Sequence, residues 1–348
     1  MAEMIKKDPV LSVKDLKVSF STYAGEVQAV RGVTWELGRE ETIAIVGESG
    51  CGKTVSIQTA MGLLAKPAGR IKEGSIIFDG KDITNYTAKQ MRWIQGNEMT
   101  MIFQDPLTYL NPTMRVGRQI AEAYLQHHPG MKKKDAEERV LEFMRKVSLP
   151  NPEENMRRYP HELSGGMRQR VMVAMALICE PKILFADEPT TALDVTIQAQ
   201  IIDLMKTLKS EISGSIVLIT HDLGVVANMA ERVYVMYAGQ IVEHGCLDEI
   251  FENPRHPYTI GLLRSVPRLD TEDKVELAYI PGSPPDLLAP PVGCAFAERC
   301  PFAMNICKAW QPEYKYFDET HYSACWLNEP AAMEKWGDIT AKGVFGDV

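Results

Sequence analysis

TIAIVGESGCGKT, residues 42–54, is the stretch that decides the fold. Its first five residues are apolar or β-branched, a pattern typical of a buried strand. A glycine-rich loop follows at once, and residues 54–64 then show the apolar spacing of a helix. A buried strand that leads through such a loop into a helix predicts the beginning of an α/β fold.

The loop satisfies the pattern G-x-x-x-x-G-K-[ST] between a strand and a helix, which identifies it as a P-loop. Backbone N–H groups in such a loop surround a β-phosphate, and the helix N-terminus adds partial positive charge. Lys53 is expected to neutralise the β- and γ-phosphate oxygens, and Thr54 to ligate Mg²⁺. The expected nucleotide contacts are Gly47, Ser49, Gly50, Cys51, Gly52, Lys53 and Thr54. The same positive field could activate the Cys51 thiol, but we interpret this cysteine as a passive small residue.

A second strand-like run, residues 182–186, ends in the adjacent carboxylates Asp187 and Glu188. In isolation an Asp-Glu pair is most often a solvated turn. At the end of a buried strand, in a chain with a P-loop, the two carboxylates can divide two tasks. Asp187 is expected to hold Mg²⁺ through a water, and Glu188 to orient and deprotonate the attacking water.

The remaining pattern alternates strands and helices. Strand-like runs at 75–78, 99–103 and 215–220 lie between helical segments, which favours an α/β core with a largely parallel sheet. Residues 131–149 place apolar side chains on one helical face and indicate an inserted helical subdomain. Five prolines within residues 281–291 disfavour a helix or central strand there and indicate a linker or extended arm.

Composition narrows the classes of partner. The formal net charge of −8 provides no basic footprint for nucleic acid. The longest apolar run, residues 171–179, is far shorter than the roughly 18 residues that span a bilayer, so we expect membrane association only through partner proteins. The N-terminus has no secretory pattern, and the seven cysteines are therefore expected to stay reduced inside the cell.

The pentapeptide LSGGM, residues 163–167, narrows the choice among P-loop ATPases. Ser164 at a helix start, followed by two glycines, exposes backbone donors suited to a γ-phosphate. In order with the P-loop and the paired carboxylates, this segment resembles the signature of the ABC ATPases. The family usually has Gln at the position of Met167, so we expect no side-chain amide contact there, whereas the donors of Ser164, Gly165 and Gly166 are intact.

The resemblance implies further site residues. Gln104 resembles the Q-loop glutamine, which contacts Mg²⁺ and senses the transmembrane partner. Residues 191–194, TALD, resemble the D-loop at the dimer interface and end at Asp194. His221 resembles the switch histidine that contacts the γ-phosphate, whereas a lone histidine at a strand end is usually structural. The Mg²⁺ ligands implied are Thr54, Gln104 and Asp187.

An aromatic ring near the start of the chain is expected to stack on adenine. Phe20 is preferred from its spacing to Ala29, and Tyr23 is the alternative. Core packing is the ordinary role for a phenylalanine at such a position.

Two longer segments refine the resemblance. FQDPLTYLNP, residues 103–112, and NPRHPYT, residues 253–259, are similar to the ATPases of oligopeptide/dipeptide importers, and the match covers nearly the whole chain. The family also contains nickel, glutathione and oligosaccharide importers, so the cargo stays open. The resemblance implies an ABC ATPase domain over residues 1–260, with a helical subdomain at about 105–180, and a C-terminal extension over 261–348.

Four cysteines gather in this extension, in the spacing C-x5-C-x6-C-x17-C. The close pairs usual in zinc sites are absent, four thiolates suit an iron–sulfur cluster, and four unliganded buried thiols are a third interpretation. The resemblance implies a [4Fe–4S] cluster, structural or redox-sensing, at Cys294, Cys300, Cys307 and Cys325.

The resemblance implies an ATPase that powers peptide import from the cytoplasmic face of the membrane. ATP and Mg²⁺ would fill two composite sites in a head-to-tail dimer with a homologous but distinct ATPase subunit. The other expected partners are two permease subunits and, indirectly, an extracytoplasmic substrate-binding protein. One rival is a soluble ABC ATPase acting on nucleic acid or ribosomes, but those carry paired ATPase domains, long coiled coils or basic surfaces. A second rival is an iron–sulfur redox sensor.

Overall fold

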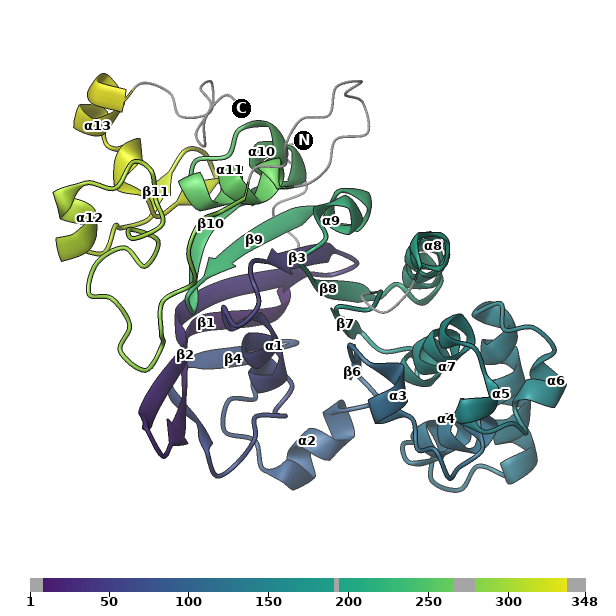
Figure 1. Cartoon of the computed structure of the whole chain (residues 1–348). Coiled ribbons are helices and arrows are strands. Elements are labelled where there is room, and N and C mark those ends of the chain that lie inside the picture. The colour runs from purple at the N-terminus through teal and green to yellow at the C-terminus, as the bar shows by residue number, and fades with distance from the viewer. Residues whose placement is uncertain (1–8, 191–193, 266–278, 337–348) are drawn as a thin grey trace, which may run out of the picture.

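A computed structural model describes residues 9–190, 194–265 and 279–336. These residues form two β-sheets with helices around them (Figure 1). The first sheet has the order β2-β1-β4-β5, and the second has the order β11-β12-β10-β9-β3-β8-β7-β6. The chain therefore has the predicted α/β class.

The first sheet is antiparallel throughout. Its strands are β1 (Pro9–Thr22), β2 (Gly25–Gly38), β4 (Gly69–Phe78) and β5 (Lys81–Asp82). Most apolar residues of β1 and β2 are buried in one core cluster with Ile43 and Ile45 of β3 and with Ile57 and Ala60 of α1. Within that cluster the Trp35 indole Nε1 donates to the Ser56 hydroxyl over 2.9 Å, which ties β2 to α1. The sequence predicted the strand-like run at 75–78, which lies in β4, but not a separate antiparallel sheet.

The second sheet is parallel at its centre. Its strands are β3 (Thr42–Val46), β6 (Met99–Ile102), β7 (Ile183–Asp187), β8 (Ser215–Thr220), β9 (Arg232–Tyr237), β10 (Gln240–Cys246), β11 (Lys315–Tyr316) and β12 (Tyr322–Ser323). The run β6-β7-β8-β3-β9 is parallel, and β10, β12 and β11 continue it antiparallel. Every residue of β3, β7 and β8 is buried, as expected for strands covered on both faces.

Helices cover the second sheet and form a group beside it. They are α1 (Lys53–Ala60), α2 (Ala88–Ile94), α3 (Pro106–Tyr109), α4 (Val116–Leu125), α5 (Lys133–Lys146), α6 (Pro152–Asn155), α7 (Gly165–Leu177), α8 (Val195–Ile212), α9 (Leu223–Met229), α10 (Leu247–Glu252), α11 (Pro257–Arg264), α12 (Asn305–Ala309) and α13 (Pro330–Trp336), with 3-10 turns η1 (Pro160–Glu162) and η2 (Trp326–Asn328). Figure 1 shows α3 to α7 gathered at one side of the molecule, away from β1 and β2. This group lies where the sequence predicts a helical subdomain.

The C-terminal region is joined to the main sheet rather than separate from it. Strand β12 pairs with β10 through Ser323 opposite Glu243 and Tyr322 opposite His244. Residues 281–291 form neither helix nor strand, in agreement with the proline-based prediction of an extended arm. The family-like segment 253–259 has a structural explanation here, because the buried Glu243 carboxylate accepts the backbone N–H groups of Arg255 and His256.

A partly buried ion pair joins the amino ends of two central strands. Arg232, at the start of β9, donates through Nε and Nη2 to the two carboxylate oxygens of Glu41, over 2.6 and 2.9 Å. The Arg232 side chain is 22% exposed and that of Glu41 is 13% exposed. Such side-on pairing is among the stronger forms of charge-assisted hydrogen bond.

Replacing Arg232 with Met should lower the free energy of unfolding by about 2 kcal/mol, because the Glu41 carboxylate would stay partly buried without its cation. Denaturant or thermal unfolding of the purified chain measures this change. An unfolding midpoint equal to that of the unsubstituted chain would contradict the importance given to this pair.

Candidate nucleotide site

The P-loop joins β3 to α1 and requires glycine at two positions. Gly47 has φ +149° and Gly52 has φ +99°, both in the region that side chains other than glycine rarely adopt. A Cβ atom at Gly47 would lie 2.1 Å from the carbonyl oxygen of Met236, and one at Gly52 would lie 2.3 Å from that of Ala29. The loop backbone is thus packed directly on neighbouring main chain.

Lys53 is folded back over the loop. Its ammonium donates to the carbonyl oxygens of Gly47 and Glu48 over 2.7 and 2.9 Å, and to the Cys51 sulfur over 3.7 Å. Burial raises the pKa of the Cys51 thiol, although the nearby Lys53 charge acts in the opposite direction. A thiol kept neutral at this position fits the interpretation of Cys51 as a passive small residue.

Asp187 lies next to the P-loop helix. The Thr54 hydroxyl donates to Asp187 Oδ1 over 3.1 Å, and Asp187 is only 6% exposed. Burial raises the pKa of this carboxyl; the Thr54 hydrogen bond and the Lys53 charge oppose the rise, and the Glu188 charge adds to it. A carboxylate and a hydroxyl side by side offer two oxygen ligands for a hard cation such as Mg²⁺.

The structure brings Gln104, Glu188 and His221 together. Gln104 Nε2 donates to Glu188 Oε2 over 2.8 Å, and His221 Nδ1 lies 3.2 Å from Glu188 Oε1. These residues follow the carboxyl ends of β6, β7 and β8, which are adjacent parallel strands. Glu188 itself has φ +46°, and its N–H donates to the carbonyl of Ile219 over 2.8 Å. Its carboxylate is therefore held in place by both backbone and side-chain contacts.

The predicted signature segment lies elsewhere in the chain. Ser164 caps α7, and its hydroxyl accepts the N–H of Met167 over 3.4 Å. Ser164 and Gly165 are exposed, Gly166 is half-buried, and a Cβ at Gly165 would meet nothing within 4 Å. Figure 1 shows α7 within the helical group, apart from α1 at the P-loop. The open donors of this segment and the P-loop thus belong to different parts of one chain.

The structure describes only part of the predicted D-loop and gives only the surroundings of the two rings predicted to stack on adenine. Residues 191–193 of the predicted D-loop lie outside the described residues, whereas the exposed Asp194 caps α8 by accepting the N–H of Ile197 over 3.0 Å. Phe20 is half-buried and packs against the first core cluster, while Tyr23 is fully exposed. Adenine stacking by either ring stays a prediction.

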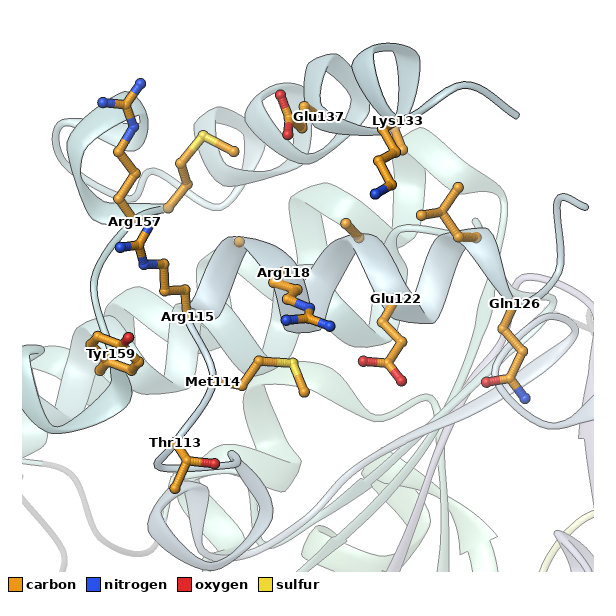
Figure 2. Close-up of a pocket in the computed structure, with 15 residues that line it drawn as sticks. Thr113, Met114, Arg115, Arg118, Glu122, Gln126, Lys133, Glu137, Arg157 and Tyr159 are labelled. Carbon is orange, nitrogen blue, oxygen red and sulfur yellow. The ribbon is translucent and has the colours of Figure 1, made fainter. Parts of the chain in front are cut away.

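A groove of about 1110 Å³ runs along the helical group, lined by residues of α4, α5 and the turns around them. Figure 2 shows Arg118 and Glu122 on the helix that lies along it, with Thr113, Met114 and Arg115 at the start of that helix. Four basic and two acidic side chains line it: Arg115, Arg118, Lys133, Arg157, Glu122 and Glu137. This groove begins nine residues after Gln104 and was not predicted from the sequence.

Sequence reasoning also missed contacts that reach the P-loop from the C-terminal region. The N–H of Glu48 donates to the hydroxyl of Tyr258 over 2.7 Å, and the Glu48 carboxylate pairs with Arg299. Tyr258 belongs to the segment 253–259 that resembles the importer ATPases, so a signal existed for it. Arg299 lies 251 positions from Glu48, and no sequence pattern connects the two.

Two parts of the chain match known protein families. Residues 30–191 match the ABC transporter family, and residues 242–307 match the C-terminal region of oligopeptide/dipeptide transporters. The chain is 55% identical over 329 residues to the oligopeptide transport ATP-binding protein OppD of Bacillus subtilis (strain 168), covering 94% of this chain and 92% of the relative. It is 54% identical to the dipeptide transport ATP-binding protein DppD of the same organism, covering 93% and 96%.

The prediction of an iron–sulfur cluster is wrong. The names of these relatives indicate no cluster, and all seven cysteines are free. In the described parts of the chain, one group of three possible ligand atoms lies within 4.8 Å of one another, and it contains no cysteine: Glu249, Asp318 and His321. Burial raises the pKa of Cys294 to about 11 and that of Cys300 to about 12. The cluster was implied by the resemblance, whereas the spacing of the cysteines had also left unliganded buried thiols open.

Solved structures agree with the sequence comparison. A dimeric ATP-binding cassette in a post-hydrolysis state, bound to ADP and Pi, matches with a TM-score of 0.62 and 25% identity over 68% of this chain and 98% of that one. The relatives match at more than half identity over nearly their whole length. The chain therefore belongs to the ABC transporter ATPases, in the family of oligopeptide and dipeptide transport ATP-binding proteins.

Proposed function

We propose that this chain hydrolyses ATP to power the import of peptides through a membrane permease. The observation that carries the proposal is the convergence on Glu188 of Gln104 and His221, beside the P-loop and Asp187. A carboxylate held from two sides at the end of a buried strand is suited to act as a general base on water. The relatives named for oligopeptide and dipeptide transport support peptides as the cargo.

The residues divide the chemistry among them. Thr54 and Asp187 fit Mg²⁺ because their hydroxyl and carboxylate oxygens lie 3.1 Å apart in a largely buried place. Bound Mg²⁺ would neutralise charge on the β- and γ-phosphate oxygens. Lys53 would leave its two carbonyl partners to contact the same oxygens. Glu188 would accept a proton from the attacking water, while Gln104 and His221 keep its carboxylate in position.

A second subunit would complete each site. The signature residues Ser164, Gly165 and Gly166, of which the first two are exposed, lie at the start of α7, apart from the P-loop of their own chain. A head-to-tail dimer would bring these donors, with Asp194, to the nucleotide of the partner. The dimeric state of the similar cassette supports this arrangement, and we propose a homologous but distinct ATPase as the partner.

The groove along α4 and α5 is the proposed contact with the permease. It begins shortly after Gln104, so a segment seated there would be connected through a short stretch of chain to Glu188. Four basic side chains against two acidic ones favour an acidic cytoplasmic segment of a permease subunit. Within the described residues, no helix has the length and apolar character to cross a bilayer. We therefore propose a peripheral place at the cytoplasmic face of the membrane, with a substrate-binding protein supplying the peptide from the other side.

We propose the division of the chain into an ATPase domain at 1–260, including a helical subdomain at about 105–180, and an extension at 261–348. The helical group α3 to α7 supports the subdomain, and the match of residues 242–307 to a C-terminal transporter region supports an extension, although that match begins before residue 261.

Replacing Glu188 with Gln should leave ATP binding intact and lower the ATPase rate at least ~100-fold, because the amide cannot accept the proton of water. The complex with its permease, assayed for phosphate release and nucleotide binding, provides the measurement. Glu211→Gln on the exposed face of α8 is the control and should hydrolyse ATP normally. Normal turnover in the Glu188 variant would refute the assignment.

Replacing Asp187 with Asn should raise the unfolding temperature of the nucleotide-free chain and abolish Mg²⁺-dependent hydrolysis. The folded-state pKa of Asp187 is raised above its ordinary 3.8, so folding opposes the ionised form. Below pH 3.8 the Asp187 carboxyl is protonated in both the folded and the unfolded chain, so the variant is no more stable than the unsubstituted chain. Its advantage should grow as the pH rises from 3.8 through the folded pKa and stay constant above it. Thermal scans in EDTA at several pH values test this, and a less stable variant at pH 7 would contradict it.

Replacing Arg118 with Glu should weaken association with the permease roughly tenfold, because it reverses a charge inside the groove. Nucleotide binding by the isolated chain should stay unchanged. The matched control is Lys134→Glu on α5, whose exposed side chain does not line the groove. Binding to permease in detergent or nanodiscs measures both, and equal affinities for the two variants would exclude the groove as the contact.

A further inference from the structure

The second residue of the P-loop is held by an arginine from the C-terminal region. Arg299 Nη1 and Nη2 donate to the two carboxylate oxygens of Glu48 over 2.6 and 2.9 Å. The remaining N–H groups of the guanidinium donate to the Tyr237 hydroxyl and to the carbonyls of Ile280 and Pro281. Every N–H donor of this side chain is therefore used. The orientation of the guanidinium group is fixed, and its charge is paired with the Glu48 carboxylate.

The same P-loop residue is held through its backbone. The N–H of Glu48 donates to the Tyr258 hydroxyl over 2.7 Å. Tyr258 is fully buried in α11 and packs with Tyr237 and Phe296, whose rings lie 4.6 and 5.4 Å from its own. The Arg299 guanidinium lies 5.9 Å from the Phe296 ring. Residues of one packed cluster thus hydrogen-bond with both the main chain and the side chain of Glu48.

The contacts of Arg299 and Tyr258 with Glu48 affect the loop that carries Lys53, the residue expected to contact phosphate. The carbonyl oxygen of Glu48 is one of the two that accept the Lys53 ammonium, and it also accepts the N–H of Cys51. A shift of Glu48 would therefore move the turn of the loop, and with it the position from which Lys53 would leave this carbonyl when ATP binds. Small displacements of a phosphate-binding backbone are costly because its N–H groups act only in the correct geometry.

We propose that Arg299 and Tyr258 are positioning residues that hold the P-loop backbone ready for the phosphates of ATP, so that the C-terminal region sets the affinity for nucleotide. The inference rests on the proposed ATPase function and deepens it. Neither residue contacts the reacting atoms; both act through Glu48. A purely structural role would instead change the stability of the chain and leave its affinity for ATP unaltered.

The test compares Arg299→Met and Tyr258→Phe with the unsubstituted chain in complex with its permease. Each variant should raise the KM for ATP and the Kd for ATP, by about tenfold for Arg299→Met and less for Tyr258→Phe, with kcat changed less than twofold. Tyr258→Phe removes one oxygen and keeps the buried ring, so it serves as the test if Arg299→Met does not fold. An unchanged KM in a folded variant would overturn the proposal.

Arg232→Met is the matched control, because Arg232 makes a similar buried pair with Glu41 at the opposite ends of the strands. It should lower the unfolding temperature and leave the KM for ATP unchanged. An equal rise of KM in this control would show that loss of stability alone weakens ATP binding, and would overturn the proposal.

A double-mutant cycle separates the pair from its surroundings. If Arg299 acts through Glu48, then Glu48→Gln should raise the KM for ATP. The KM of the double variant with Arg299→Met should then be no higher than the larger of the two single-variant values. A double variant whose KM rises by the product of the two single fold-increases would contradict that route. If the unsubstituted complex hydrolyses no ATP, the proposed function fails; if it does and only the Arg299 and Tyr258 results disagree, the further inference alone fails.

Discussion

The register of the parallel strands is the constraint on which the site depends. Val46 of β3 pairs with Thr220 of β8, and Asp187 of β7 pairs with Ile219 of the same strand. The carboxyl ends of these strands therefore lie level at one edge of the sheet, where ligand loops of α/β proteins belong. A slip of one residue would turn the side chains of a strand to the opposite face and separate Thr54 from Asp187. Fully buried strands resist such a slip because their neighbours leave no space for it.

Two carboxylates beside the P-loop show how surroundings decide a role. Glu48 is paired with a guanidinium whose other donors are all satisfied, so its charge is already compensated within the chain. Asp187 is buried with a hydroxyl as its hydrogen-bond partner, and burial raises its pKa. The first arrangement is typical of a pair that holds the neighbouring backbone in position. The second leaves charge to be balanced by a cation, which is the property expected of a Mg²⁺ ligand.

Local patterns in the sequence were sufficient for the centre of the molecule. The P-loop, the run into Asp187 and the apolar strands each carry their signal within a few residues, so the α/β fold and its nucleotide edge were predictable. The resemblance supplied roles for Gln104 and His221, but their contacts with Glu188 depend on which strands are neighbours. The antiparallel sheet escaped prediction because irregular pairing of β1 with β2 blurs the alternation of apolar residues. The spacing of the cysteines does not distinguish ligands from buried thiols, and the cluster that the resemblance implied was wrong.

Contacts between distant parts of the chain lay beyond sequence reasoning for a physical reason. The Arg299–Glu48 pair joins residues 251 positions apart, and either residue alone looks like an ordinary charged side chain. Its presence means that the P-loop is supported from the C-terminal region, whereas the signature segment lies at the start of α7, apart from the P-loop. In the proposed mechanism, affinity for ATP would then be set largely within one subunit, and hydrolysis would wait for the partner. A transporter ATPase needs such a separation, because nucleotide must bind before dimer closure and be hydrolysed only after it.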